Sequence, residues 1–375
     1  MRKINVAVLA GGRSSEHDIS RLSAMSIIGA LDPERYEPVA VLIERSGDWR
    51  LTSPAKLALP GTPQADPSTG LAHDRALNGV PAGGSPARVH SETRPATVTS
   101  PSTALRGVDV IFPVLHGSFG EDGTIQGLLE TAGVPYVGAG VLASAVGMDK
   151  AIFKAILRDA GIPVAPGVVA HAHAQRTDRA ELVATVANDY GFPVFVKPAR
   201  MGSSIGISRA TNEAELLTAL ELAFEHDSKV LVEQAIEGIE IEVGVLGNHD
   251  PIVSIPGEVV IADDAEWYDF DTKYLEGGMR LEVPARISEA ATARVQEVAL
   301  QVFRAIDCAG LARVDCFVTP AGDVVVNEVN TMPGFTATSA YAKLFEASGY
   351  RYNDIVDRLI ELAIDRHREQ SDLRH

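Results

Sequence analysis

Short apolar runs and segments with helical spacing alternate along the first third of the chain. Apolar runs at residues 4–10, 38–43 and 108–115 predict buried strands, and the first run ends at a Gly-Gly pair typical of a tight turn. A helix is expected over residues 124–132. This alternation predicts a parallel α/β layer in the N-terminal part of the chain.

A segment of different composition interrupts this layer over residues 60–103. Pro, Gly, Ser, Thr and Ala dominate there, and the apolar residues follow no regular period. Such a composition buries little apolar surface and is typical of a long surface loop. We therefore expect an insertion that carries no chemistry of its own.

Beyond residue 148 the pattern changes from α/β to α+β. A helix is expected over residues 149–160, and a final amphipathic helix over residues 353–368 has its apolar side chains on one face. Between them we expect a helix over residues 213–224 and strands over residues 193–197, 206–209, 229–233, 240–246, 252–256, 312–319 and 324–329. The chain is therefore expected to form three domains, residues 1–148, 149–233 and 234–375.

The composition fits a globular protein. Of 375 residues 46% are hydrophobic, yet no apolar stretch approaches the roughly 18 residues that a membrane span needs. The N-terminus lacks the features of a secretory signal, so a cytoplasmic location is expected. The net charge of -17 disfavours nucleic acid and anionic membranes as partners. Cys308 and Cys316 are too few for a disulfide framework and are expected to be buried thiols.

Two strands near the C-terminal end flank a turn of composition Pro-Ala-Gly-Asp at residues 320–323. If the turn is centred on its Ala-Gly step, the numbers of cross-strand partners sum to 643. Asp315 then faces Glu328, and Arg313 faces Asn330. Because side chains alternate along a strand, all four lie on one face of the sheet.

Opposed carboxylates on one sheet face destabilise each other. A divalent cation between Asp315 and Glu328 would remove that repulsion. Two carboxylates and the amide of Asn330 are oxygen ligands that suit Mg²⁺, which keeps waters and shares phosphate oxygens. The alternative is a solvated polar face whose carboxylates are neutralised by neighbouring side chains.

A loop rich in glycine and serine follows Lys197 at the end of a predicted strand. Glycine permits close backbone approach, and the N–H groups and hydroxyls of such a loop can donate to phosphate oxygens. The segment is not a Walker A motif, and an ordinary hairpin loop is the alternative. Lys150, near a predicted helix start, fits either a phosphate contact or an exposed position.

Two further junctions between strand and helix carry polar side chains. Glu16 stands at a helix start that could hold a small charged ligand or could be an ordinary capped terminus. The dinucleotide fingerprint Gly-x-Gly-x-x-Gly is missing there. His116, at the second junction, is open to a structural or a catalytic role.

Six segments, taken together and in order, resemble the D-alanine–D-alanine ligase family of the ATP-grasp superfamily. They read GGRSSEHDIS, LHGSFGEDGTIQG, GMDK, FVKPARMGSSIG, YDFDTKY and NEVNTMPGFT, at residues 11–20, 115–127, 147–150, 195–206, 268–274 and 327–336. The resemblance covers nearly the whole chain except the expected insertion.

The resemblance implies an ATP-grasp fold with an N-terminal parallel α/β domain, a small central lid domain and a C-terminal mixed-sheet domain. It implies an enzyme that joins two D-alanine molecules through a D-alanyl phosphate, giving D-alanyl-D-alanine, ADP and phosphate for peptidoglycan precursor synthesis. ATP as a substrate, two Mg²⁺ ions with Mn²⁺ as a substitute, and a homodimer are implied as well.

The resemblance also implies roles for individual residues at the metal and nucleotide sites. The Mg²⁺ ligands would be Asp315, Glu328 and Asn330, which is the face that the hairpin register selects. The ATP phosphates would meet the two lysines and the loop, and the adenine and ribose would meet the strand end beyond them. The phosphate contacts would be Lys150, Lys197 and Ser204. The adenine would be contacted by Glu233 and Ile236, and the ribose by Glu240.

For the amino acid substrates, the resemblance implies that Glu16 holds the ammonium of the first D-alanine, linked to Ser203 and Tyr274, with His116 beside it. Arg313 and the backbone of Gly334 would stabilise the oxyanion. The carboxylate of the second D-alanine would be bound by Ser339 and Lys273. Two departures from some relatives are Ala235 in place of an aromatic residue near the base, and Ala340 in place of a larger apolar residue.

Three alternatives stay open. Another carboxylate–amine ligase could use a different acceptor, including D-lactate, although Tyr274 after Lys273 favours the dipeptide-forming branch. A nucleotide-binding regulatory module is disfavoured because the carboxylates, Arg313 and both lysines are all present. A dinucleotide-dependent oxidoreductase is disfavoured by the missing glycine fingerprint.

Overall fold

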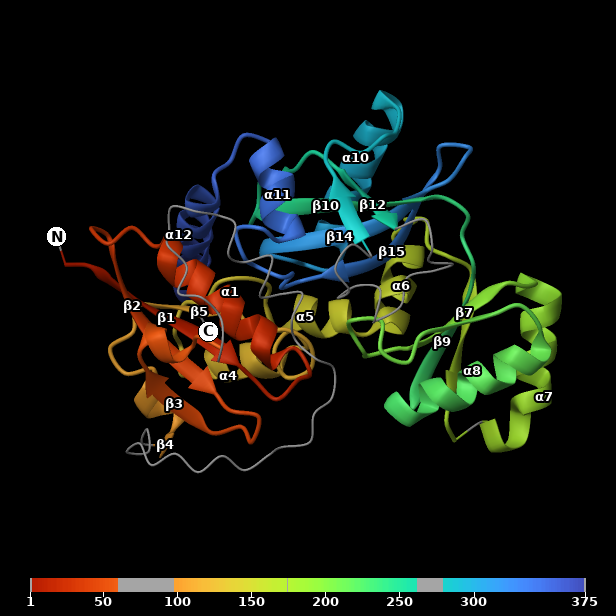
Figure 1. Cartoon of the computed structure of the whole chain (residues 1–375), viewed down its shortest axis with the longest axis horizontal. Coiled ribbons are helices and arrows are strands. Elements are labelled where there is room, and N and C mark those ends of the chain that lie inside the picture. Colours follow the sequence, from red (N-terminus) through yellow and green to blue (C-terminus); the bar gives the residue numbers. More distant parts are fainter. Residues whose placement is uncertain (1, 60–97, 174, 262–278, 374–375) are drawn as a thin grey trace.

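The computed structural model describes residues 2–59, 98–173, 175–261 and 279–373. Three sheets make up this part of the chain, and in Figure 1 the C-terminal sheet lies between the N-terminal and central sheets. Most of the expected insertion and the whole YDFDTKY segment at residues 268–274 lie outside the described residues. None of the described helices is long and apolar enough to cross a membrane.

The N-terminal part contains a five-stranded sheet. Its strands are β1 (Ile4–Gly11), β2 (Tyr36–Ile43), β3 (Trp49–Thr52), β4 (Val98–Thr99) and β5 (Val110–Pro113). Its helices are α1 (His17–Ala30), α3 (Pro101–Ala104) and α4 (Thr124–Ala132). β1 pairs in parallel with both β2 and β5, which confirms the predicted parallel layer, while β3 and β4 extend the sheet in antiparallel fashion.

Helices on both faces explain why β1 is a continuous apolar run and not an alternating one. Val6 and Val8 pack in the same core cluster as residues of α1, whereas Ala7 and Leu9 pack with residues of α4. The tight turn after the strand requires glycine at position 11. Gly11 has a φ of 89°, and a Cβ there would lie 2.4 Å from a backbone oxygen of β2.

Residues 98–103, which we expected within the insertion, form strand β4 and most of helix α3. β4 pairs with β3, and Ser100 caps α3 by accepting a hydrogen bond from Thr103 N at 3.3 Å. Ala104 and Leu105 are buried in the core beneath this sheet. The predicted boundary at residue 103 is therefore wrong. A strand of two residues has no period that the sequence could reveal.

The central part contains a four-stranded antiparallel sheet of order β6-β9-β7-β8. Its strands are β6 (Gly167–His171), β7 (Val194–Pro198), β8 (Ser208–Ala210) and β9 (Lys229–Gln234), and its helices are α7 (Gln175–Thr185) and α8 (Glu213–His226). α8 packs on the sheet through Leu216, Ala219, Leu220 and Ala223, which recur at helical spacing. The predicted α+β unit is confirmed, and β6 and α7 were not predicted.

The C-terminal part contains a six-stranded sheet of order β13-β12-β10-β14-β15, with β11 paired to β10. Its strands are β10 (Ile239–Gly247), β11 (Ile252–Val253), β12 (Gly257–Ile261), β13 (Met279–Glu282), β14 (Gly310–Val318) and β15 (Val324–Asn330). Its helices are α10 (Glu289–Ala305), α11 (Ala340–Ala347) and α12 (Tyr352–Ser371). The strand predicted over residues 252–256 is only two residues long.

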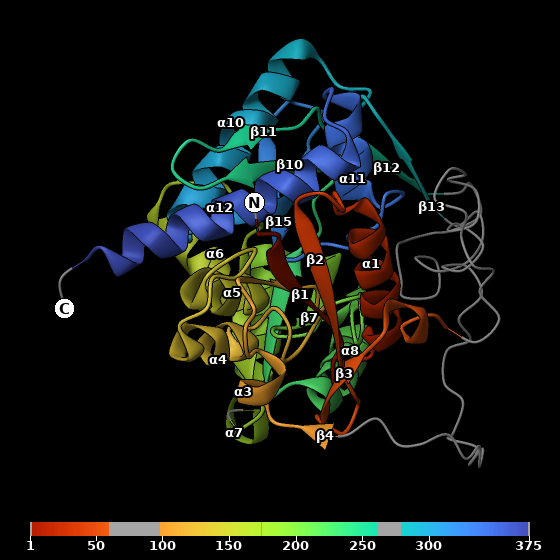
Figure 2. The same ribbon diagram turned by 90° about the vertical axis from the view of Figure 1, so that its left-hand side faces the viewer.

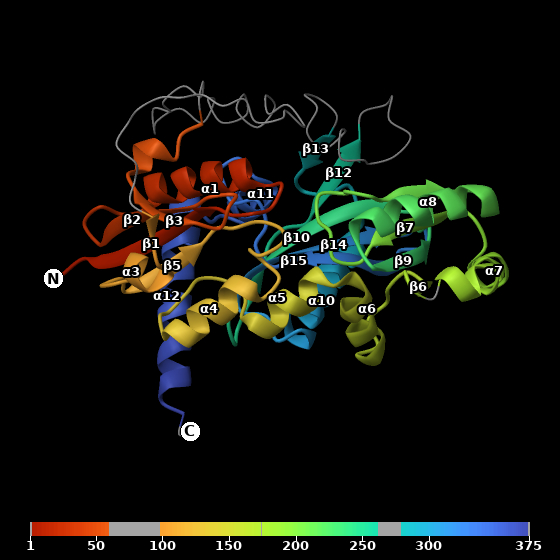
Figure 3. The ribbon, with the colours of Figure 1, turned by 90° about the horizontal axis from the view of Figure 1, so that it is seen from below.

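Helices outside the C-terminal part also pack on its sheet. α5 (Val141–Met148) and α6 (Lys150–Asp159) share a core cluster with α10, β14 and β15, and Figure 3 shows the three helices along one side of this sheet. The boundary that we propose between residues 148 and 149 therefore falls between two helices with a common core. That packing fixes where α6 presents its side chains.

The last helix joins the N-terminal and C-terminal sheets. Buried residues of α12, among them Leu359, belong to one core cluster with Val6 of β1, Phe112 of β5 and Tyr341 of α11. Figure 2 shows α12 crossing beside β1 and β2. The two sheets therefore do not move independently without exposing this shared core.

Leu359→Ala is expected to lower the free energy of unfolding by about 2–5 kcal/mol, because it leaves a cavity in the shared core. Arg358→Ala, at an exposed neighbouring position, should change it by less than about 0.5 kcal/mol. Chemical denaturation measures both variants. Equal effects at the two positions would show that α12 does not stabilise the junction.

Candidate active site

Two adjoining cavities lie where the three sheets approach one another. The first, of about 570 Å³, opens between the central and C-terminal sheets, and the second, of about 300 Å³, reaches toward the N-terminal sheet. Every predicted site residue within the described ranges lines at least one of them. The first is lined by Lys150, Lys197, Ser203, Ser204, Glu233, Ile236, Glu240, Arg313, Asp315 and Glu328, and the second by Glu16, His116, Lys150, Ser203, Arg313, Glu328, Asn330, Gly334 and Ser339.

The hairpin of β14 and β15 supplies one wall of the site. Asp315 pairs with Glu328 and Arg313 pairs with Asn330, so the predicted partners and their common face are confirmed. The register shifts immediately beyond Asp315, and on the turn side the partner numbers sum to 642. The predicted turn centre is therefore wrong, and the irregularity in the ladder restores the predicted pairs.

That irregularity is a β-bulge at Asn327, which has no partner of its own in the ladder. Asn327 lines the same cavity as its neighbour Glu328 and accepts a hydrogen bond from Lys197 (Nζ to Oδ1, 3.1 Å). Regular alternation would place Asn327 on the opposite face from Glu328. The sequence could not reveal this residue because the bulge is not visible in the pattern.

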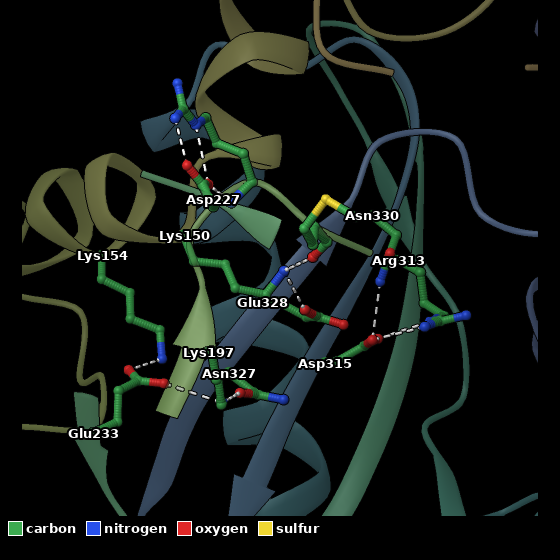
Figure 4. A network of polar contacts seen from close by, with 12 residues as sticks. Lys150, Lys154, Lys197, Asp227, Glu233, Arg313, Asp315, Asn327, Glu328 and Asn330 are labelled. Carbon is green, nitrogen blue, oxygen red and sulfur yellow. Dashed lines mark hydrogen bonds and ion pairs between the residues drawn. The ribbon is translucent and has the colours of Figure 1, made fainter. Parts of the chain in front are cut away.

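Basic and amide groups neutralise the opposed carboxylates, as Figure 4 shows. Arg313 donates from Nε and Nη2 to the two oxygens of Asp315, at 2.7 Å each, and Asn330 Nδ2 donates to Asp315 Oδ2 at 2.9 Å. Lys150 Nζ lies 3.2 Å from Glu328 Oε2. The alternative to a bound cation, a face neutralised by neighbouring side chains, is therefore present. The two charged neighbours, Lys150 and Arg313, are also suited to binding phosphate oxygens.

The oxygen donors of this face fit a magnesium ion. Asp315, Glu328 and Asn330 offer carboxylate and amide oxygens, which match the preference of Mg²⁺. Over the described ranges, no group of three or more His, Cys, Asp or Glu side chains is arranged to hold a metal. Such a partial set suits an ion that takes waters and phosphate oxygens as its other ligands.

Buried ion pairs lie at one end of the first cavity. Lys197 Nζ is 3.0 Å from Glu233 Oε2, and Lys154 forms an ion pair with Glu233 Oε1. Burial alone would raise the pKa of Glu233, but the ammonium groups of Lys197 and Lys154 outweigh burial and hold that pKa below its ordinary value. Burial would lower the pKa of Lys197, but the Glu233 carboxylate outweighs it and raises that pKa. Glu233 and Lys197 are therefore both charged at neutral pH.

The loop between β7 and β8 connects the central and N-terminal parts. Ser203 and Ser204 have φ values of 51° and 58°, a left-handed conformation that is uncommon outside glycine and that concentrates at functional sites. Ser203 Oγ donates to Glu16 Oε1 at 2.8 Å. The contact that the resemblance implied between these two residues is present. Tyr274, the third member of that set, lies outside the described residues, as does Lys273.

His116 is buried in the wall of the second cavity. Its Nδ1 lies 3.0 Å from the carbonyl oxygen of Met332, and its Nε2 lies 3.2 Å from Ser23 Oγ. Burial lowers the pKa of His116, so the ring is neutral, with Nδ1 donating to the carbonyl and Nε2 accepting from the serine. The histidine thus links the loop that carries Met332 to helix α1, and it also lines the second cavity.

Glu121 bridges the two loops that form the second cavity, and the sequence did not single it out. Its Oε1 accepts from Gly117 N at 2.8 Å and its Oε2 accepts from Met332 N at 3.2 Å. Burial, followed by the nearby Glu16 carboxylate, raises the pKa of Glu121 to about 8. A carboxylate in a glycine-rich loop gives no local signal of such a distant partner.

Ser339 and Gly334 lie at the far side of the second cavity. Ser339 precedes α11, and its Oγ accepts from Thr336 N at 3.0 Å and lies 2.7 Å from Thr336 Oγ1. A Cβ at Gly334 would lie 3.6 Å from Ser339 Oγ, so the backbone here is open to the cavity. Gly334 and the Ser339 hydroxyl therefore lie close together in the wall of the second cavity.

The three-sheet architecture and the charged site between the central and C-terminal sheets define an ATP-grasp enzyme. Family models then identify the group within that class. The model described as the D-ala D-ala ligase N-terminus matches residues 5–139, and the model of the D-ala D-ala ligase C-terminus matches residues 156–361. The chain belongs to the D-alanine–D-alanine ligase family.

Curated relatives are similar over nearly their full length. D-alanine--D-alanine ligase A of Chromobacterium violaceum is 44% identical over 370 residues, 98% of this chain and 97% of the relative. D-alanine--D-alanine ligase of Heliobacterium modesticaldum is 45% identical over 373 residues, 99% of this chain and 97% of the relative.

Solved structures of the family are similar as well. The D-alanine-D-alanine ligase from Coxiella burnetii is 36% identical with a TM-score of 0.78, and the match covers 99% of this chain and 97% of that one. The VanG D-Ala:D-Ser ligase from Enterococcus faecalis is 34% identical with a TM-score of 0.79, covering 96% and 100%.

The raised pKa of Glu121 predicts a pH-dependent stability. Because this pKa is about 8 in the folded protein against an ordinary value of 4.5, the folded state binds the extra proton between these values. Its contribution to the free energy of unfolding therefore falls as pH rises from about 5 to about 8. Glu121→Gln cannot ionise, so its stability relative to the wild type should improve across that range.

Denaturation without nucleotide or divalent cation, at the two pH values, measures this difference. Glutamine accepts weaker hydrogen bonds than glutamate, but any loss of unfolding free energy that does not depend on pH cancels when the two pH values are compared. Glu346→Gln, at an exposed position on α11, serves as the control and should differ from the wild type by the same amount at both pH values. A constant difference for Glu121→Gln would contradict the raised pKa.

Proposed function

We propose that the protein is a D-alanine–D-alanine ligase, which uses ATP to join two D-alanine molecules and releases ADP and phosphate, for peptidoglycan precursor synthesis. Relatives at 42–45% identity that bear this name support the reaction. The observation that carries it is the face of Asp315, Glu328 and Asn330. It lies between the two cavities and is flanked by Lys150 and Arg313.

ATP is placed in the first cavity. Lys150 and Lys197 would contact its phosphates, and the hydroxyl of Ser204 and the neighbouring N–H groups would close over them. These local cations offset the negative net charge of the chain for an anionic ligand. The adenine and ribose would be met at the other end of the cavity by Glu233, Ile236 and Glu240.

Mg²⁺ would be held by Asp315, Glu328 and Asn330, with two ions in the site and Mn²⁺ as a substitute. When bound, the metal supplies neutralisation of the negative charge on the phosphates. Lys150 and Arg313 stand beside the same carboxylates, so both side chains lie within reach of substrate oxygens bound there.

The first step activates one D-alanine. A carboxylate is a poor acyl donor, so one of its oxygens attacks the γ-phosphorus of ATP, the bond to the bridging oxygen breaks, and ADP and D-alanyl phosphate form. Glu16 would hold the ammonium of this D-alanine, and the hydrogen bond from Ser203 orients the Glu16 carboxylate. The neutral ring of His116 adds no competing positive charge.

The second step forms the peptide bond. The ammonium of the second D-alanine first loses a proton to water, and the free amine then attacks the acyl carbon. The bond from carbon to the phosphate oxygen breaks, and the departing phosphate takes up the proton that the new amide nitrogen releases. Arg313 and the N–H of Gly334 would stabilise the oxyanion that forms between attack and departure of the phosphate. Fixed donors lower the barrier most where charge develops during the reaction. Ser339 and Lys273 would bind the carboxylate of this second D-alanine.

A different acceptor is the second candidate function. One similar solved structure is a D-Ala:D-Ser ligase. Ala340 lines the second cavity together with Ser339. It is smaller than the apolar residue of some relatives, so we infer a wider acceptor subsite. Tyr274 after Lys273 favours an amine acceptor over D-lactate. A homodimer and a cytoplasmic location complete the proposal and rest on the family resemblance.

With ATP, Mg²⁺ and D-alanine, the purified protein should release one ADP and one phosphate for each dipeptide formed. A coupled ADP assay with mass spectrometry of the product measures this ratio. Offered D-alanine and D-serine together, the protein should make mainly D-alanyl-D-alanine. ADP release that does not depend on D-alanine would contradict the ligase, and D-alanyl-D-serine as the main product would favour the second candidate.

Glu328→Gln should lower kcat by at least about 10²-fold, because the site loses a charge that binds metal and orders Lys150. Glu346→Gln, at an exposed position on α11 that lines neither cavity, should keep wild-type turnover. Both proteins should unfold cooperatively at similar temperatures. Wild-type turnover in folded Glu328→Gln would remove Glu328 from the metal site.

A further inference from the structure

Lys154 is the buried lysine that the proposed reaction leaves without a role. It lies one helical turn after Lys150 on α6, so the two side chains point from the same face of the helix. The Lys154 side chain is 1% exposed, and that of its partner Glu233 is 2% exposed. Glu233 lines the first cavity, whereas Lys154 does not. Lys154 therefore contacts the site only through Glu233.

Glu233 is held between two ammonium groups. Lys154 pairs with Oε1 and Lys197 lies 3.0 Å from Oε2 (Figure 4). Oε2 is buried, and the Lys197 ammonium is the one described group that lies close to it. A carboxylate oxygen can accept more than one hydrogen bond, and Glu233 lines the first cavity, where a ligand can supply a further donor.

Burying a lysine is unfavourable unless it is paired, and burial here lowers the pKa of Lys154 to about 8. An apolar side chain of similar length would fill the same space without that penalty. The charge is therefore better explained by what it does to Glu233. It keeps the carboxylate ionised and fixes which way its oxygens point, so that Glu233 can only accept hydrogen bonds.

An acceptor in this position discriminates between purine bases. A 6-amino base, such as adenine, presents a donor to Glu233, whereas a 6-oxo base, such as hypoxanthine, presents an acceptor that the carboxylate repels. Gln234 at the end of β9 and Ile236 just beyond it line the cavity next to Glu233. Phe195 adds an apolar side chain to the same wall.

We propose that Lys154 is a positioning residue for nucleotide selection, which holds Glu233 as an oriented acceptor and thereby makes the site prefer 6-amino over 6-oxo purine nucleotides. The inference rests on the proposed function only in placing the nucleotide in the first cavity. Lys154 does not touch the nucleotide, and its effect reaches the base through Glu233.

The test compares ADP and IDP binding to the full-length protein by calorimetry, with Mg²⁺ and without D-alanine. The wild type should bind ADP more tightly than IDP. In Lys154→Met the ratio of ADP affinity to IDP affinity should fall by about tenfold, the usual effect of weakening a charge-assisted hydrogen bond. A loss of phosphate contacts weakens both ligands equally because ADP and IDP carry the same phosphates, so the ratio of the two affinities reports on the base.

Lys229→Met is the matched control, because it removes another partly buried ion pair, with Asp149, that does not contact Glu233. Its ratio of ADP to IDP affinity should equal that of the wild type. If Lys154→Met does not fold, Lys154→Gln keeps a donor to Glu233 without the charge and should still narrow the ratio.

An unchanged ratio in a folded Lys154 variant would overturn the proposal, and so would a wild type that binds ADP and IDP equally. A variant that only loses thermal stability would show that Lys154 is structural. Failure of the proposed function gives a different result. The protein would then still bind ADP, but D-alanine would not stimulate the conversion of ATP to ADP.

Discussion

The site depends on two carboxylates, Asp315 and Glu328, held opposite each other on one face of the β14–β15 hairpin. Like charges in that arrangement repel, so the surrounding chain must supply positive charge. Arg313 comes from the same strand as Asp315, whereas Lys150 comes from α6, whose position is fixed by a core shared with the third sheet. The packing of α6 in that core therefore places the Lys150 ammonium beside Glu328, where it offsets the repulsion between the two carboxylates.

The same helix serves both ends of the proposed nucleotide site. Lys150 pairs with Glu328 at the end where we place the phosphates, and Lys154 one turn later pairs with Glu233 at the end where we place the base. The hydrogen bond from Ser203 to Glu16 then closes the central part against the N-terminal part. Few of these groups are fully exposed, so their interactions are stronger than in water and need little reorganisation during the reaction.

Local patterns in the sequence predicted the parallel N-terminal layer, α4 and α8, because hydrophobic periodicity acts over a few residues. The pairing of Asp315 with Glu328 was predicted correctly, although the turn centre behind it was wrong and the bulge at Asn327 compensates. That bulge leaves no pattern in the sequence, and the bridge made by Glu121 depends on a partner distant in the chain. α10 was missed although its buried residues recur at helical spacing. The motifs located the site, and only the structure revealed the buried side chains behind it, such as Lys154.

The central claim is that the charged face between the cavities promotes phosphoryl transfer to a substrate carboxylate. D-alanine labelled with ¹⁸O in its carboxylate tests this directly, with the released phosphate analysed by mass spectrometry. One labelled oxygen should appear in phosphate for each dipeptide formed, because the oxygen that attacks ATP leaves with the phosphate. Unlabelled phosphate, or label found in AMP, would contradict an acyl phosphate and with it the role given to this face.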